Sequence, residues 1–169
     1  AHLARVLGFN VAAFSRSHAL CEGVLASESL KELIQWSDVV SLHVALTPET
    51  HEMISGEVID WLSGKSLINT ARGGLVAERQ ILEALEHADL DVDWRARLPR
   101  SGDLLHTNAL QVLDGRASDR APEFRAGNFL ISMKMIDLIA VVDRERKIAV
   151  WAMQGPFHFQ HDPRVLDDG

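Results

Sequence analysis

The chain has 169 residues, 47% of them hydrophobic and 24% charged, which is the composition of a soluble globular protein. This length allows one ordinary domain or two incomplete ones, and it excludes two complete enzyme domains. The net charge of -7 argues against a nucleic-acid-binding protein, and no apolar run approaches the roughly 20 residues of a membrane-spanning helix.

Cysteine and histidine usage narrows the chemistry further. The single Cys21 cannot form an intramolecular disulfide and favours a reducing compartment, so we expect a cytoplasmic protein. The eight histidines show no zinc-ligand spacing, so we expect no metal site. The first residues include no Met and no signal-peptide pattern, and we interpret the chain as an internal fragment.

Residues 1–90 alternate between strand and helix patterns. Short apolar runs typical of buried strands are followed by leucine and isoleucine at helical spacing, and Ser27 or Ser29 could cap one of these helices. The expected strands are residues 9–14, 38–44 and 66–69, and the expected helices end at Gly8 or cover 30–34, 53–62 and 75–85. Such alternation predicts right-handed βαβ crossovers and a parallel sheet.

Residues after about 100 show a different pattern, with strands that have no helices between them. The expected strands are 104–113 around His106, 129–133, 138–142 and 148–152. The charged turn 143–147 joins the last two, so we predict a short antiparallel meander. The fold class is therefore α/β, with a partial parallel sheet followed by antiparallel strands.

Ligands of a parallel sheet bind at the carboxyl ends of its strands, so the residues just past each strand are candidate site residues. They are Ser15, Arg16 and Ser17 after the first strand, Val44 and Ala45 after the second, and Thr70, Ala71 and Arg72 after the third.

Two stretches resemble signatures of the D-2-hydroxyacid dehydrogenase family: DVVSLHVALTPET at 38–50 and INTARGGLV at 68–76. The resemblance covers residues 1–90 and implies a Rossmann-type NAD(P)-binding domain, truncated at both ends. It implies that Arg72 binds the substrate carboxylate and polarises its carbonyl, which suits a planar, permanently charged group. It also places Thr70 and Ala71 at the nicotinamide, and Val44, Ala45 and Thr50 at the adenosine and ribose.

Alternatives remain for several of these residues. Ala45 stands where the family usually has Pro, so this loop can be looser. Thr50 could instead be a helix cap or turn residue, and Arg72 a surface ion-pair partner.

The residues after the first strand bear on cofactor choice. NAD-selective enzymes usually place Asp or Glu there to accept from a ribose hydroxyl, whereas NADP requires that anion to be absent and a cation nearby. The segment Ser15-Arg16-Ser17 has no carboxylate and contains an Arg, so we predict NADP(H) in preference to NAD(H).

Other family features are missing. The Gly-rich phosphate-binding fingerprint would precede residue 1, and beyond Leu90 the family's catalytic Glu and Pro-His have no counterparts, with only Asp91-Val92 matching faintly. We expect a domain that binds a nicotinamide nucleotide and a small 2-oxo or 2-hydroxy acid but is catalytically incomplete.

Residues 100–169 resemble the arylsulfotransferase-like β-propellers. The similar stretches are 105–113, 124–132, 150–156 and 160–163. In that family a channel His becomes sulfated, and the matching positions are His106 and His161; either could equally be an ordinary hydrogen-bonded residue. Such a short piece leaves strand edges and apolar side chains exposed, which favours homo-oligomerisation or packing against the first half.

We therefore expect a partial dinucleotide-binding domain over 1–90, a linker over 91–103 and a propeller-like segment over 104–169. The charge balance also changes between the halves: residues 1–90 carry six Lys/Arg against twelve Asp/Glu, and residues 91–169 eleven against twelve. The leading hypothesis is an oxidoreductase-type domain; the alternatives are sulfuryl transfer through His106 or His161, and a non-catalytic fusion fragment.

Overall fold

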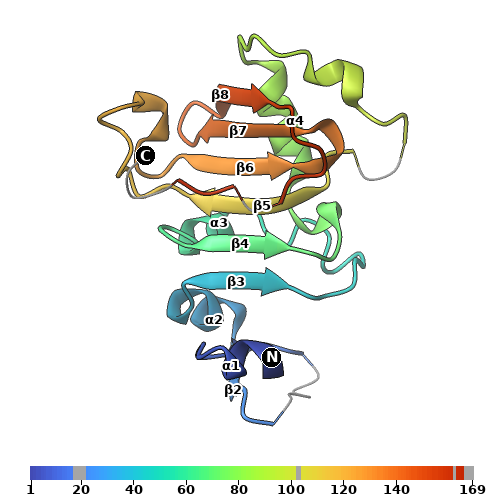
Figure 1. Ribbon diagram of the computed structural model, residues 1–169. Helices are drawn as coiled ribbons and strands as arrows, with labels where there is room; N and C mark the ends of the chain where they lie inside the picture. The colour runs from blue at the N-terminus through green and yellow to red at the C-terminus, as the bar shows by residue number, and fades with distance from the viewer. Residues whose placement is uncertain (17–21, 102–103, 162, 166–169) are drawn as a thin grey trace. The chain divides into compact units, whose positions relative to one another are not determined.

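The computed structural model describes residues 1–16, 22–101, 104–161 and 163–165. The chain divides into two compact units, Ala1–Asp38 and Val39–Gly169 (Figure 1). In the described residues no helix is both long and apolar enough to cross a membrane.

The first unit contains two helices and one pair of short parallel strands. Its elements are α1 (His2–Val6), β1 (Ala12–Ala13), β2 (Leu25–Ala26) and α2 (Leu30–Trp36). The predicted glycine end of the first helix is confirmed, because Gly8 has a φ of 89° and its N–H donates to the Arg5 carbonyl. Ser29 caps α2 by accepting the Glu32 N–H at 3.1 Å, so of the two candidates Ser27 and Ser29 it is Ser29 that caps this helix.

The second unit is built on one six-stranded sheet. Its strands are β3 (Val39–Leu42), β4 (Ser66–Asn69), β5 (Thr107–Val112), β6 (Phe129–Met133), β7 (Leu138–Asp143) and β8 (Ile148–Gln154). Its helices are α3 (Glu57–Trp61), η1 (Gly73–Leu75), α4 (Glu78–Glu86), η2 (Trp94–Arg97), η3 (Pro122–Phe124) and η4 (Lys134–Ile136). The strands lie side by side in chain order (Figure 1).

Strand direction divides the sheet into two parts. β3 and β4 pair in parallel, as the βαβ pattern predicts, whereas β4 to β8 are antiparallel throughout. The predicted α/β class with a parallel part and an antiparallel meander is confirmed. β4 pairs directly with β5, from Ser66 opposite Gln111 to Ile68 opposite Ala109. The meander therefore continues the parallel sheet, and the edge of the meander at β5 is covered by β4. The domain boundaries at 90 and 103 stay a prediction.

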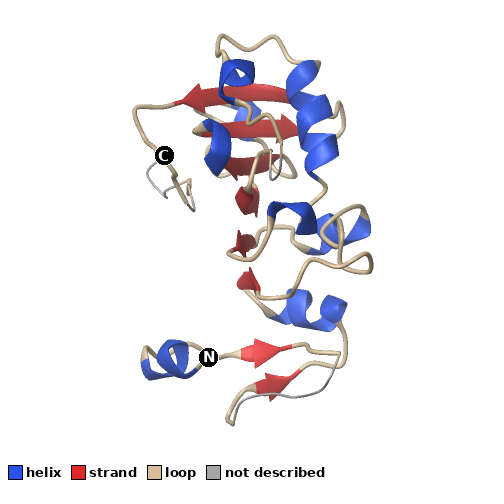
Figure 2. Cartoon of the chain, turned by 90° about the vertical axis from the view of Figure 1, so that its right-hand side faces the viewer, coloured by secondary structure: helices blue, strands red, loops and turns tan. Residues whose placement is uncertain are grey.

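The two faces of this sheet have different covers. Helix α4 lies on one face and contacts β8, while the chain after β8 returns across the other face (Figure 2). On that second face Leu130 and Val141 form a buried cluster against which Phe124 and Trp151 pack, with their rings edge to face at 5.3 Å. Ile131 is also buried, but adjacent strand residues alternate in direction, so it faces the opposite side from Leu130.

The predicted charged turn at 143–147 forms the β7–β8 hairpin. The carboxylate of Asp143 accepts the N–H groups of Glu145 and Arg146 and the guanidinium of Arg125. Burial alone raises the pKa of Asp143, but these N–H groups and Arg125 outweigh it and hold that pKa below its ordinary value. Asp143 therefore stabilises the turn as a charged carboxylate.

Candidate functional site

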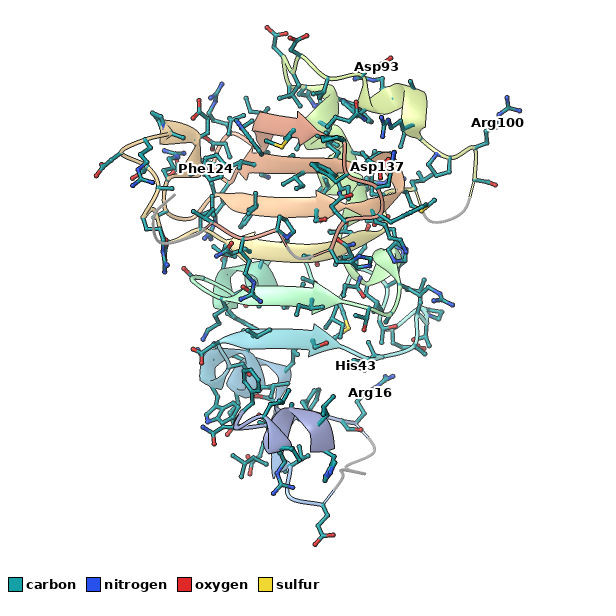
Figure 3. The ribbon with its side chains drawn as sticks, in the orientation of Figure 1. Arg16, His43, Asp93, Arg100, Phe124 and Asp137 are labelled. Carbon is teal, nitrogen blue, oxygen red and sulfur yellow. The ribbon has the colours of Figure 1, made fainter. Side chains whose placement is uncertain are left out.

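The carboxyl ends of β3 and β4 lie at the same edge of the sheet. The parallel register places Leu42 beside Asn69, so the segments that follow the two strands start as neighbours. His43 projects from this edge (Figure 3). Val44, Ala45 and Thr70 are exposed and Ala71 is half-buried, which leaves these four predicted cofactor-contacting positions accessible to a ligand, whereas Thr50 is buried.

Asn69 organises the segment that contains Arg72. This side chain is 2% exposed, and its Oδ1 accepts the N–H groups of Ala71 at 3.1 Å and Arg72 at 3.3 Å. Its Nδ2 donates to the carbonyls of Arg72 at 2.6 Å and Thr107 at 3.1 Å. The amide thus uses both its donors and both its acceptor positions, which fixes the backbone on either side of Arg72.

Two residues of the dehydrogenase-like half hold Thr107, the first residue of β5. Asn69 donates to its carbonyl, and Glu78 of α4 accepts its N–H at 2.8 Å. The strand that begins the arylsulfotransferase-like stretch is therefore bonded to the same amide that shapes the Arg72 loop. Sequence reasoning missed Asn69, although a polar residue at a buried position of an apolar strand is a usable signal.

Arg72 lines an open pocket. Its backbone is extended, its Nη1 donates to the Ala71 carbonyl at 2.9 Å, and its side chain is exposed. The pocket has a volume of about 650 Å³ and is lined by Arg72 together with Leu46, His51, Glu52, Gly74, Val76, Glu78, Arg79, Leu82 and Leu104. This arrangement offers a guanidinium to a small anionic ligand.

The hydroxyl of Thr50 is occupied within its own loop. It donates to the Ala45 carbonyl at 2.7 Å and accepts the Thr47 N–H at 2.8 Å, while the residue is 7% exposed. These bonds match the turn role considered for Thr50. They also fix the carbonyl of Ala45, which restrains a loop that has no proline at that position.

The remaining nucleotide-binding candidates belong to the first unit. Ser15 is half-buried and Arg16 is exposed just after β1, while Ser17 lies outside the described residues. Between β1 and residue 16 the chain carries no carboxylate.

The two histidines singled out for sulfuryl transfer come from different segments of the chain, which Asn108 joins by donating to the Gln160 carbonyl at 2.6 Å. His106 is half-buried and has a φ of 49° immediately before β5. The strand predicted over 104–113 therefore begins only at Thr107, and His106 precedes it. His161 is exposed in the segment after β8.

A third histidine has a carboxylate partner. His158 Nδ1 lies 2.9 Å from Asp137 Oδ2, which Arg97 Nη1 also contacts at 2.6 Å. Burial alone raises the pKa of Asp137, but the Phe159 N–H, His158 and Arg97 together keep it below its usual value. Figure 3 shows Asp137 at the opposite end of the meander from Phe124. His158 was not a sequence candidate, because its partner is 21 residues away.

No group of His, Cys, Asp and Glu side chains able to hold a metal ion occurs in the part of the chain that the structure describes.

Two family models match the chain, and they overlap. Residues 1–112 match the D-isomer specific 2-hydroxyacid dehydrogenase, NAD binding domain, and residues 60–169 match arylsulfotransferase (ASST). The overlap contains β4, α4 and β5, where the two parts of the sheet meet.

Curated relatives are dehydrogenases. A D-specific alpha-keto acid dehydrogenase of Enterococcus faecium is 41% identical over 87 residues, which are 51% of this chain and 26% of that protein. A glycerate dehydrogenase of Methylorubrum extorquens is 42% identical over 89 residues, 47% of this chain and 28% of that protein. The chain thus spans about a quarter of the length of these relatives.

Among solved structures, a D-isomer specific 2-hydroxyacid dehydrogenase from Xanthobacter autotrophicus Py2 in complex with NADPH and MES is 36% identical. The match covers 50% of this chain and 36% of that chain, with a TM-score of 0.43.

Proposed function

Because the chain belongs to the D-isomer specific 2-hydroxyacid dehydrogenase family over residues 1–112 and to the arylsulfotransferase family over residues 60–169, we propose that its leading function is dehydrogenase-like. In this proposal the chain binds a nicotinamide nucleotide, prefers NADP(H) to NAD(H), and contacts a 2-oxo or 2-hydroxy acid through Arg72. Turnover is weak, since the residues after Leu90 supply no counterpart of the family's catalytic Glu and His.

The observation that carries the proposal is the fixed loop around Arg72. Asn69 holds the backbone of Ala71 and Arg72, and Arg72 lines an open pocket next to the carboxyl ends of two parallel strands. A planar guanidinium can pair with a carboxylate through two parallel hydrogen bonds and also withdraw charge from the neighbouring carbonyl oxygen.

The cofactor contacts are assigned within each unit separately. In the first unit Ser15 and Arg16 fit the adenosine ribose and its 2′-phosphate, and Ser17 extends that segment in the sequence. In the second unit Val44, Ala45 and Thr50 correspond to adenosine and ribose contacts, and Thr70 and Ala71 to the nicotinamide side. When bound, the nicotinamide supplies the hydride that reduces the carbonyl carbon.

The missing acid–base pair limits the rate. A positioned general acid typically contributes about 10²–10⁴-fold to a proton-transfer step, and here water must deliver the proton. We therefore expect nucleotide and 2-oxo acid binding to survive better than turnover.

A fluorescence titration of the full chain with NADPH and NADH tests the proposal. Trp36 and Trp61 lie in the dehydrogenase-like residues, and the reduced nicotinamide reports binding itself. We expect saturable binding with NADPH tighter than NADH, and Arg16→Ala should weaken NADPH about 10-fold while changing NADH little, as for one charge-assisted contact. Lys31→Ala, which removes a cation from α2 in the same unit, is the matched control.

Two results would contradict this proposal. Tighter binding of NADH would overturn the preference for NADP(H), while absence of binding by either nucleotide would overturn the dehydrogenase-like function itself.

Sulfuryl transfer is the second candidate function. It is favoured by the arylsulfotransferase match and by the contacts of His158, whose Nδ1 is oriented by Asp137 beside Arg97. Such an arrangement leaves Nε2 to act as a nucleophile or base. Phenyl sulfate desulfation that is lost in His158→Ala would support this candidate, whereas loss in His106→Ala or His161→Ala would assign it to the sequence-based positions.

Cytoplasmic location, homo-oligomerisation through exposed apolar side chains and the 91–103 linker also stay predictions. Size-exclusion chromatography of the full chain addresses the second of these, and limited proteolysis between residues 91 and 103 the third.

A further inference from the structure

The six-stranded sheet ends at β8, and no strand of the described chain pairs with the outer edge of β8 (Figure 1). Among the described residues only β7 forms backbone hydrogen bonds with β8, so the N–H and C=O groups that point away from β7 have no backbone partner there. Ile148–Gln154 includes no charged residue and no proline, the residues that commonly block an edge strand, and its one irregularity is a bulge at Val150. β8 can therefore accept a further strand.

Open space lies beside this strand. A pocket of about 690 Å³ is lined by Ile148, Ala149 and Val150 of β8 and also by His87 and Asp89, which follow α4. The space between the start of β8 and the segment after α4 is thus not filled by described side chains. An added strand would find room for its own side chains at this point.

The surroundings of this edge are acidic. Segment 86–93, which follows from the end of α4, contains four carboxylates and no Lys or Arg. Asp93 lies beyond the edge of β8 in Figure 3. Asp89, Asp91 and Asp93 are exposed, and none of them forms an ion pair with another residue that the structure describes. These three carboxylates are therefore available to a cationic partner.

The nearby cations do not balance the carboxylates. Arg125 already pairs with Asp143 and Glu145, and Arg144 with Asp60. With His87 neutral, segment 86–93, the pocket lining and the turn 143–147 together carry seven carboxylates and four cations: Glu86, Asp89, Asp91, Asp93, Glu123, Asp143 and Glu145 against Arg125, Arg144, Arg146 and Lys147. The edge thus favours a basic partner and disfavours a second copy of the chain, which would bring two acidic segments together.

We infer that the outer edge of β8 binds an extended, basic peptide segment of a partner protein, which adds to the sheet as a further strand. Backbone hydrogen bonds to β8 supply affinity, and side chains at alternate positions of the added strand supply specificity. Its lysine or arginine side chains lie near Asp89, Asp91 and Asp93. This inference goes beyond the proposed function and does not depend on it, since it involves neither the nucleotide nor Arg72.

Fluorescence anisotropy of labelled peptides with the full chain tests the inference. The probe is a peptide as long as β8 that alternates lysine and valine. One control peptide alternates glutamate and valine, and another has the lysine–valine sequence with every backbone N–H methylated, so it keeps its charge but cannot donate as a strand. We expect the probe to bind at least about 10-fold tighter than either control. Hydrogen exchange should slow in β8 and stay unchanged in β3, the strand at the other edge of the sheet.

Charge variants locate the acidic contact. Asp89→Asn, Asp91→Asn and Asp93→Asn combined should weaken the probe about 5–10-fold, as expected for three exposed ion pairs. The matched control combines Glu22→Gln, Glu28→Gln and Asp38→Asn, which removes three exposed carboxylates from the first unit and should change its affinity little.

Four results would overturn the inference. Absence of probe binding would remove the basic partner, and equal binding of the methylated peptide or unchanged exchange in β8 would remove strand addition. Equal weakening in the two combined variants would show that the segment after α4 makes no local contact. A dimer that forms as the protein concentration rises, with β8 protected in the absence of peptide, would assign the edge to a second copy instead.

Discussion

The parallel and antiparallel parts of the six-stranded sheet differ in where their polar side chains lie. At the end of the parallel pair, Asn69 and Thr50 use their side chains to fix loops that leave Arg72 and Ala45 exposed to a ligand. In the meander, Asp143 fixes a hairpin turn. The same kind of side-chain to backbone bond therefore shapes a candidate site in one region and stabilises the scaffold in the other, and substitutions can separate the two roles.

Truncation in the centre of the meander should have the largest effect on stability. Ile131 is 1% exposed on the middle strand β6, so Ile131→Ala should lower the free energy of unfolding by about 2–5 kcal/mol through lost burial and a cavity. Urea unfolding followed by tryptophan fluorescence measures the change. A loss below about 0.5 kcal/mol, the size expected of a surface substitution, would show that the meander does not support the fold.

Asn69→Ala should affect both stability and ligand binding. It removes four hydrogen bonds and leaves the Thr107 carbonyl without its amide donor, at a cost of about 1–3 kcal/mol. Loosening of Ala71 and Arg72 should also weaken 2-oxo acid binding, measured by calorimetry with NADPH present.

The matched control is Asn108→Ala in the meander. Asn108 is 2% exposed and donates to the Gln160 carbonyl at 2.6 Å, so its side chain bonds the segment after β8. It should lower stability without changing the affinity for 2-oxo acids. Equal losses of affinity in the two variants would remove the distinction between site and scaffold.

Acid should weaken the hairpin through Asp143. Because the pKa of this carboxyl is depressed in the folded chain, its stabilisation is fully present above the unfolded pKa of about 3.9 and is lost as the pH falls through the lower folded value. Asp143→Asn should cost about 1–2 kcal/mol at pH 7, and less at pH 3. Thermal unfolding of both proteins at the two pH values gives the comparison. A cost for Asp143→Asn that is the same at both pH values would contradict a charged Asp143.

The smallest effect is expected at Thr50. Thr50→Val keeps the shape of the side chain but removes the bonds to Ala45 and Thr47, so stability should fall by about 0.5–1.5 kcal/mol. Thr50→Ser should restore it. If Thr50→Val instead weakens NADPH binding with unchanged stability, its hydroxyl contacts the nucleotide and is not a turn element.

Local sequence patterns predicted most secondary structure of the second unit. The strands 66–69 and 129–133 occur as predicted, and those around 138 and 148 extend by one or two residues. Predictions were poorer where pairing is short: of residues 9–14 only Ala12 and Ala13 form a ladder, and the helix predicted over 53–62 is limited to Glu57–Trp61. Strand and helix ends depend on partners, which a local pattern does not contain.

For the candidate site, the sequence determined the loop that carries Arg72 and the family to which residues 1–112 belong, because contiguous residues encode both. Only the tertiary structure decided that β5 pairs with β4, that Asn69 reaches Thr107 across 38 residues, and that Arg79 lines the pocket of Arg72. The reason is physical: strand register and side-chain proximity are set by burial across distant segments, so residues far apart in the chain become partners only when the sheet forms.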